Sequence, residues 1–207
     1  MKTTLACLLG LVIGAGHASA QDEAELAKQL ANPVASLISL PIQANYDANI
    51  GADEEGSVWR TNIQPVIPLS LGENWNLISR TILPVVSQSN IPTAGLGETG
   101  IGDIVQSLFV SPKEPTKRGW VWGAKPVLLV PTASKDTLGS EQWGVGPTAL
   151  ALKQRGPWTV GALVNHIESV AGSDDRAGVS ATFVQPFLTY ITRTKTSLSL
   201  TTESTYD

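Results

Sequence analysis

The chain is poor in several residue types that stabilise or catalyse in other proteins. It has one cysteine and two histidines in 207 residues. The cysteine, Cys7, lies inside an apolar N-terminal segment, so the chain beyond it offers no disulfide and no His/Cys zinc site. Charged residues make up only 15%, against roughly 25% in typical soluble domains. The formal net charge is −4, so the basic surface typical of nucleic-acid-binding proteins is missing. We expect no nucleic-acid partner, no metal and no cofactor.

The first twenty residues have the pattern of a secretory signal. Lys2 precedes an apolar run over residues 5–16, and Ala18-Ser19-Ala20 supplies the small residues of a cleavage site. The run is shorter than the about 20 residues of a transmembrane helix. Cys7 precedes most of the run, which argues against lipoprotein processing. We therefore predict export, with the signal peptide cleaved after Ala20.

One short helical stretch and then a repeating β pattern follow the signal. DEAELAKQL, residues 22–30, has acids in its first turn and is followed by Asn32-Pro33, as a short helix requires. Nine segments rich in Val, Ile, Leu, Thr and Trp come next, separated by turn residues. They span residues 36–47, 58–69, 75–88, 100–111, 119–132, 142–153, 158–170, 178–191 and 197 onward. Each is long enough to cross a bilayer as a tilted strand, which takes about 9 to 11 residues.

The connections between these segments alternate in length and in charge. Four longer connections, residues 49–57, 89–99, 133–141 and 171–177, have formal charges that sum to −6. The shorter turns between them sum to +5. Every second connection of an up-and-down meander lies on the same side. Long acidic loops are thus expected at one rim and short basic turns at the other, as in outer-membrane barrels.

The tryptophans support the same interpretation. All six lie at or near the start of a segment, where a membrane-spanning strand meets the lipid headgroups. The alternation of the connections predicts Trp59 and Trp143 in an outer girdle. It predicts an inner girdle of Trp75, Trp120, Trp122 and Trp158. The alternative is a soluble β-sandwich whose core is capped by tryptophans.

Alternation within the segments indicates which side chains face a lumen. Residues 60, 62 and 64 are polar and share one face, whereas Trp59, Ile63 and Ile67 share the other. Extending this pattern predicts a lumen lined by Asn45, Arg60, Asn62, Gln64, Arg80, Lys125, His166, Glu168 and Gln185. The assignment depends on register, because a slip by one residue exchanges the two faces. Proline removes a ladder donor, so we expect bulges near Pro41, Pro65, Pro84, Pro126 and Pro186.

These patterns predict an all-β fold, an antiparallel up-and-down transmembrane barrel preceded by a short N-terminal helix. The expected regions are a signal peptide over 1–20, a helical segment over 21–35 and the barrel over 36–207. The helical segment is expected either as a plug in the lumen or as a periplasmic tail. Nine strands is an odd number, whereas single-chain bacterial barrels have even numbers, so we predict that the chain is a fragment lacking its C-terminal strands.

Several stretches of the sequence are distinctive: ELAKQLANPVASLISLPIQANYDANIG, QPVIPLSLGENWNLISRTILPVVSQ, GIGDIVQSLFVSP, WGAKPVLLVPTAS, WGVGPTALALKQRGPWTVGALVNHI and QPFLTY. Together they resemble the outer-membrane β-barrel family assigned to phenol-degradation pathways and often described as transporters. Some members of that family carry the label neuromedin U, although this chain has no dibasic processing site beside an amidation glycine. The resemblance covers residues 25–207 and implies a barrel of about a dozen strands, of which this chain holds nine.

Three functions remain open. The first is an outer-membrane channel or transporter for small solutes, which the resemblance implies to be hydrophobic or aromatic. The second is a lipid or ester hydrolase on the barrel wall that uses His166, with Glu168 two residues along and Ser169 and Ser180 nearby. The third is a structural or adhesive surface protein. The pair His166 and Glu168 is better explained as lumen lining, so we expect a non-enzymatic protein whose partners are membrane lipid and a small solute.

Overall fold

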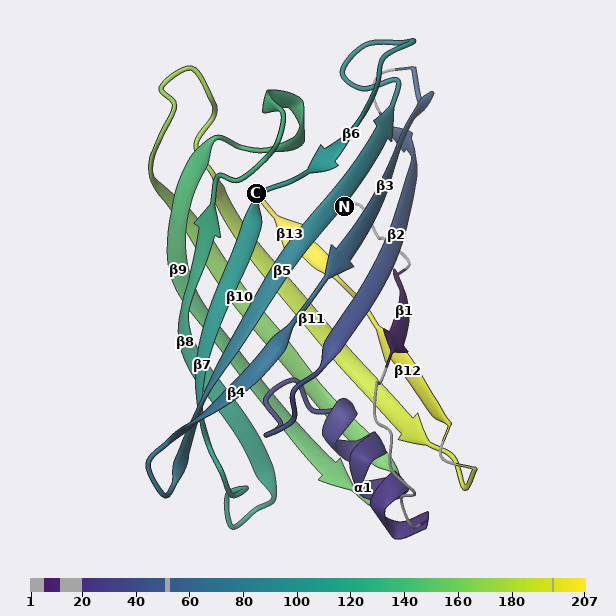
Figure 1. Cartoon of the computed structure of the whole chain (residues 1–207), viewed down its shortest axis with the longest axis vertical. Helices are drawn as coiled ribbons and strands as arrows, with labels where there is room; N and C mark the ends of the chain where they lie inside the picture. The colour runs from purple at the N-terminus through teal and green to yellow at the C-terminus, as the bar shows by residue number, and fades with distance from the viewer. Residues whose placement is uncertain (1–5, 12–19, 51–52, 195) are drawn as a thin grey trace.

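The computed structural model describes residues 6–11, 20–50, 53–194 and 196–207, with side chains from residue 25 onward. All of its described strands form one antiparallel sheet, in which the main path follows the order β1-β2-β3-β5-β7-β8-β9-β10-β11-β12. The sheet curls around a central space, with the helix α1 at one end (Figure 1). Among the described residues no backbone pairing joins β12 or β13 to β1 or β2, so the sheet curls without closing.

The elements follow the chain in simple order. They are β1 (Ala6–Leu11), α1 (Ala20–Leu30), β2 (Leu40–Ile50), β3 (Gly56–Ile63), β4 (Val66–Leu71), β5 (Trp75–Ser89), β6 (Gly97–Ile101), β7 (Ile104–Pro112), β8 (Trp120–Val130), the 3-10 turn η1 (Asp136–Leu138), β9 (Gln142–Arg155), β10 (Trp158–Gly172), β11 (Ser180–Ile191), β12 (Ser197–Thr201) and β13 (Ser204–Tyr206). Within the described part of the chain no helix is both long and apolar enough to span a bilayer.

The predicted antiparallel up-and-down β fold with a short N-terminal helix is confirmed. The twelve strands after β1 form nine runs, since three of the runs are each interrupted once and so contain two short strands. These nine runs coincide with the nine predicted segments. Strands β3 and β4 both pair with one edge of β5. Strands β6 and β7 both pair with the other edge of β5, and β12 and β13 both pair with β11. The two short strands of each interrupted run are therefore hydrogen-bonded to the same continuous partner strand.

Prolines lie at or opposite all three interruptions. Pro65 separates β3 from β4. The carbonyl of Pro84 accepts a hydrogen bond from Gly102 where β6 gives way to β7, and Pro186 accepts from Thr202 between β12 and β13. Because proline has no N–H, the ladder loses a donor at each place. These interruptions account for Pro65, Pro84 and Pro186. The bulges expected near the prolines are not found, because the register shifts of the described strands lie at residues 48–50 and 169–171, and Pro41 and Pro126 pair in regular register.

The backbone of the predicted signal segment takes part in the sheet. β1 pairs antiparallel with β2 from Ala6 opposite Asn45 to Leu11 opposite Leu40. It thereby occupies the edge of β2 that β3 leaves open. Residues 1–5 and 12–19, which include most of the predicted cleavage site, lie outside the described residues.

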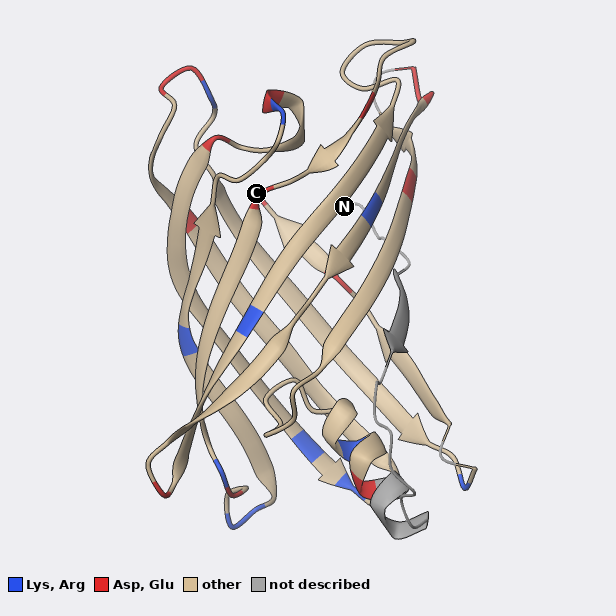
Figure 2. Ribbon diagram, viewed as in Figure 1, with Lys and Arg blue, Asp and Glu red and all other residues tan. Residues whose placement is uncertain are grey.

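The two ends of the curled sheet differ in charge. We call the end that carries residues 133–141 the loop end, and the end that carries α1 the helix end. Acidic residues predominate in the loops of the loop end, and basic residues in the turns of the helix end (Figure 2). The segregation of long acidic connections from short basic turns, predicted from the sequence, is present in the structure.

Candidate functional site

The concave face of the sheet carries the candidate site. Strand residues alternate between this inner face and the outer face, and cross-strand pairs set which is which. On β5 the inner residues include Ile78, which is fully buried, and on β7 they include its partner Phe109. The outer residues of β5 include the exposed Trp75.

Most of the predicted lumen residues lie on the inner face. Asn45 is opposite Arg60, Lys125 is opposite the buried Thr148, and Gln185 is opposite the buried Leu163. Asn62, Gln64 and Arg80 share that face. The side chains of Arg60 and Asp47 are 3.6 Å apart between Nη1 and Oδ2.

His166 and Glu168 do not line the lumen, which corrects the sequence-based assignment. β10 and β11 pair without a register shift from Trp158 to Glu168. His166 and Glu168 therefore share the face of Trp158, opposite to that of the buried Leu163. The error arose because β10 is apolar on both faces through residues 160–164, so its few polar side chains were the only guide.

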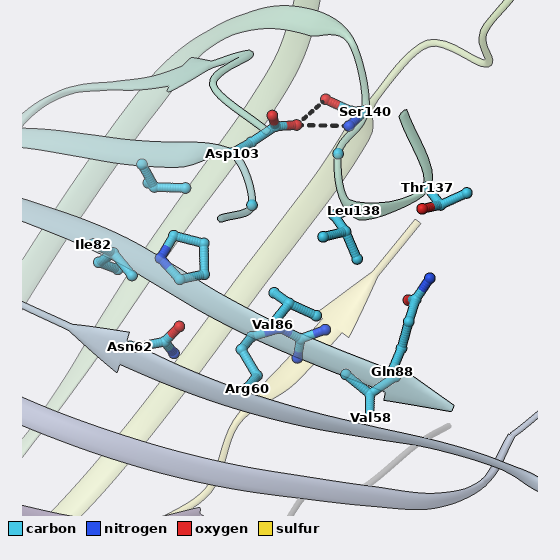
Figure 3. Close-up of a pocket in the computed structure, with 14 residues that line it drawn as sticks. Val58, Arg60, Asn62, Ile82, Val86, Gln88, Asp103, Thr137, Leu138 and Ser140 are labelled. Carbon is cyan, nitrogen blue, oxygen red and sulfur yellow. Dashed lines mark hydrogen bonds between the residues drawn. The ribbon is translucent and has the colours of Figure 1, made fainter. Parts of the chain in front are cut away.

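A cavity of about 570 Å³ lies at the loop end of the inner face (Figure 3). Its polar lining comes from Arg60, Asn62, Gln88, Asp103, Thr137 and Ser140. The rest is mostly apolar and includes Val58, Ile82, Pro84, Val86, Val105 and Leu138. A volume of roughly 300–1,000 Å³ and an apolar lining with a few polar groups are typical of small-molecule sites.

Asp103 holds the loop of residues 133–141 over this cavity. One carboxylate oxygen accepts hydrogen bonds from the backbone N–H groups of Thr132 and Ala133, both at 3.1 Å. The other accepts from the N–H of Ser140 at 2.6 Å and from its hydroxyl at 2.7 Å, as Figure 3 shows. Four donors on one carboxylate fix the loop so that Leu138 lines the cavity.

A second set of contacts ties the same loop to its neighbours. Arg176 Nε is 3.2 Å from Glu141 Oε1, and its guanidinium donates to the carbonyls of Asp136 and Gly139. Glu98 accepts from the Thr137 hydroxyl and lies 3.9 Å from Lys135. The loop therefore contacts residues 171–177 on one side and β6 on the other, as well as Asp103.

A layer of polar side chains crosses the lumen below the cavity, toward the helix end. Arg80 donates to Gln64 at 2.5 Å, and Gln64 donates to Gln43 at 2.9 Å. Glu203 accepts from Gln43 at 3.1 Å and from Gln185 at 2.7 Å, and it interacts electrostatically with Arg80. These contacts join β2, β3 and β5 to the far end of the sheet, where backbone pairing is missing.

An apolar cluster fills the lumen at the helix end. Val34 of the segment after α1 packs there with Ile78, Phe109 and Leu152. The segment is held by a 2.8 Å hydrogen bond from Gln154 to the carbonyl of Lys28 and a 2.5 Å bond from Asn76 to Ser36. Of the two placements expected for this N-terminal segment, it takes that of a plug. We call residues 27–36 the plug segment.

The six tryptophans lie on the outer face and are between 38% and 50% exposed. Trp59 is near the start of β3 and Trp143 near the start of β9, at the loop end; the other four are at the helix end. Several have aromatic neighbours: Trp158 lies 4.6 Å from Tyr190 between ring centroids, and Trp75 lies 6.0 Å from Trp122. Two bands of exposed aromatic rings thus ring the outer face.

The inner residues that sequence reasoning missed include Gln43, Gln88, Asp103 and Glu203. Gln43 and Gln88 were within reach of the alternation rule, since each lies two residues from another inner position on its strand. Asp103 lies between β6 and β7, outside any regular alternation, and Glu203 lies in the break between β12 and β13.

Comparison of the chain with protein-family models, with curated proteins and with solved structures gives no match. Within the described residues, no group of three or more His, Cys, Asp and Glu is arranged to hold a metal.

Proposed function

We propose that the chain is an integral outer-membrane β-barrel protein that takes up small, partly apolar solutes at its loop end. The observation that carries this proposal is where the charged side chains of the strands point. Five of the eight charged side chains on the described strands face inward: Asp47, Arg60, Arg80, Glu98 and Lys125. The other three face outward close to the tryptophan bands, Lys153 and Arg155 at the helix end and Glu168 toward the loop end. A soluble sandwich exposes its charges to water on the outside, whereas a membrane barrel has an apolar outer band and a polar interior.

The outer face supports a bilayer as its surroundings. Its exposed side chains include Val145, Val160, Val164, Leu128 and Leu188 between the two tryptophan bands. Outward charges near the helix end are Lys153 and Arg155, and Lys153 lies 5.8 Å from the ring centroid of Trp120. Lysine beside an interfacial aromatic ring is typical of the membrane boundary. The family resemblance to outer-membrane transporters of phenol-degradation pathways agrees with this proposal.

The cavity indicates the solute class. Its apolar lining suits a compact hydrocarbon or aromatic body, and Arg60, 42% exposed in its side chain, adds a positive charge. Polar and charged groups that line a pore tune which solutes pass. We therefore expect small solutes with an apolar body and a neutral or anionic polar end.

The test is uptake into lipid vesicles that contain the full chain, with two solutes of equal size, one anionic and one neutral. Arg60→Gln should lower the ratio of anionic to neutral uptake, because it removes the positive charge from the cavity. Arg155→Gln is the matched control, since Arg155 lies on the outer face at the helix end. It should leave the ratio unchanged.

Two results would overturn the proposal. If the vesicles take up neither solute faster than protein-free vesicles, the protein is not a channel or transporter. The adhesive role of the acidic loops then becomes the leading function. If uptake occurs but Arg60→Gln and Arg155→Gln behave alike, the cavity does not lie on the solute's path.

A further inference from the structure

Among the side chains that the structure describes, one pair breaks the lack of ionisable groups on the outer face between the tryptophan bands. His166 and Glu168 point outward from β10, and their side chains are 41% and 58% exposed. Ionisable side chains on a lipid-facing wall are unfavourable and are usually retained for function. The site is separate from the cavity, which lies on the inner face.

The geometry around His166 is that of a base held between an acid and a hydroxyl. Its Nδ1 lies 2.9 Å from the hydroxyl of Thr182 on β11. Its Nε2 lies 3.4 Å from Glu168 Oε2. A carboxylate on Nε2 favours the tautomer with its proton there, which leaves Nδ1 free to accept the Thr182 proton. Ser169, the nearest serine in sequence, instead binds the backbone N–H of Val179 at 3.0 Å.

The depth of the site also fits a specific substrate. Glu168 pairs with Val145, two residues along β9 from Trp143 of the loop-end band. With a rise of about 3.3 Å per residue and a strand tilt of roughly 40°, Glu168 lies about 5 Å below Trp143 and His166 about 10 Å below it. That is the boundary between lipid headgroups and acyl chains, where lipid ester groups lie.

We infer that Thr182, His166 and Glu168 form a hydrolytic site for the acyl esters of membrane lipids. Thr182 Oγ1 forms a bond to the ester carbonyl carbon while its proton passes to His166 Nδ1. The bond to the alcohol oxygen breaks, and that oxygen takes the proton from His166. Water then attacks the acyl-threonine ester, again giving its proton to His166. The products are a fatty acid and the deacylated lipid, and Thr182 regains its proton.

Glu168 is a positioning residue in this scheme, because it contacts the imidazole and not the ester. The acyl ester is common to glycerophospholipids and to acylated glucosamine lipids of outer leaflets. Both would reach Thr182 sideways from the bilayer, without entering the lumen.

The experiment measures fatty-acid release by the full chain in vesicles of a glycerophospholipid and, separately, of an acylated glucosamine lipid. Release from one of the two identifies the source of the ester. Thr182→Val keeps the side-chain shape and should reduce release to the protein-free rate, whereas Thr182→Ser should retain it. His166→Ala should lower the rate by about 100-fold or more. Glu168→Gln should lower kcat with little change in KM, and Glu168→Asp should restore part of it.

Thr61→Val is the matched control, since Thr61 is another half-buried threonine on the outer face, on β3. It should leave the rate unchanged, and the circular dichroism of every variant in the vesicles reports on folding. No release from either lipid by the unaltered chain would overturn the inference. Full activity in Thr182→Val would do the same, as would equal losses in Thr182→Val and Thr61→Val.

Discussion

Substituting arginine at either of two positions on β10 tests whether the outer face of the sheet is in contact with lipid or with water. Val164 and Val160 both point outward from β10 and are 41% and 51% exposed. Val164 is six residues from Trp158 and Val160 only two. At about 3.3 Å per residue and a tilt of roughly 40°, Val164 lies about 15 Å above the helix-end tryptophan band and Val160 about 5 Å above it.

The two positions thus differ in depth and little else. Arginine facing lipid costs about 2–4 kcal/mol at the midplane of the bilayer and about 0–1 kcal/mol near the interface. Val164→Arg should therefore shift the folding equilibrium by roughly 30-fold to 1,000-fold, at about 1.4 kcal/mol per factor of ten. Val160→Arg should shift it by less than about tenfold.

The assay is urea-induced unfolding of the chain in lipid vesicles, followed by tryptophan fluorescence. The free energies of unfolding of both variants are compared with that of the unaltered chain at equal lipid concentration. If the outer face were in water, both arginines would be exposed surface substitutions, with effects within about 0.5 kcal/mol. Equal and small effects in the two variants would refute a lipid-facing wall.

Substitutions at three further positions probe the lumen. Ile78→Ala should lower the free energy of unfolding by about 2–5 kcal/mol in the same urea assay, because Ile78 is fully buried; a loss below 1 kcal/mol would mean that the apolar cluster is loosely packed. Asp103→Ala removes the acceptor of four hydrogen bonds, so protease cleavage within residues 133–141 should become at least about tenfold faster; an unchanged rate would contradict this anchoring. Glu203→Ala removes the acceptor of the Gln185 amide and one of the two acceptors of the Gln43 amide, which also donates to Asn45, and should lower the free energy of unfolding by about 1–3 kcal/mol. Glu203→Gln, which keeps one carbonyl oxygen, should lower it less, and the reverse order would refute the role of Glu203.

The strands and their order were within reach of the sequence because they depend on local signals. Turn residues punctuate the chain, and each strand pairs with its neighbours along the chain, so finding the nine segments also gave their arrangement. The inner face of β3 was also predictable, since polar residues 60, 62 and 64 alternate with apolar ones.

The contacts that shape the lumen depend on tertiary structure and were out of reach. Gln43 and Glu203 are 160 positions apart, and their hydrogen bond exists only because the sheet curls. Strand β10 was also out of reach, for a local reason. Its residues 160–164 are apolar on both faces and give no alternation, so the face on which His166 lies follows only from strand pairing. Alternation assigns faces only where one face is polar and the other is not.

The three layers of the lumen have different consequences for the proposed uptake. The cavity at the loop end would select solutes, but the plug segment separates it from the helix end. That segment is held by the burial of Ala27, Val34 and Ala35, of which Val34 contributes about 1.5–3 kcal/mol, and by hydrogen bonds worth about 0.5–1.5 kcal/mol each. A difference of a few kcal/mol leaves a displaced conformation populated at roughly 0.1–10%. Passage would then be limited by withdrawal of residues 27–36, whereas the residues around Arg60 would decide which solutes enter. Substitutions in the plug segment should therefore change the uptake of all solutes alike, and substitutions in the cavity should change their ratio.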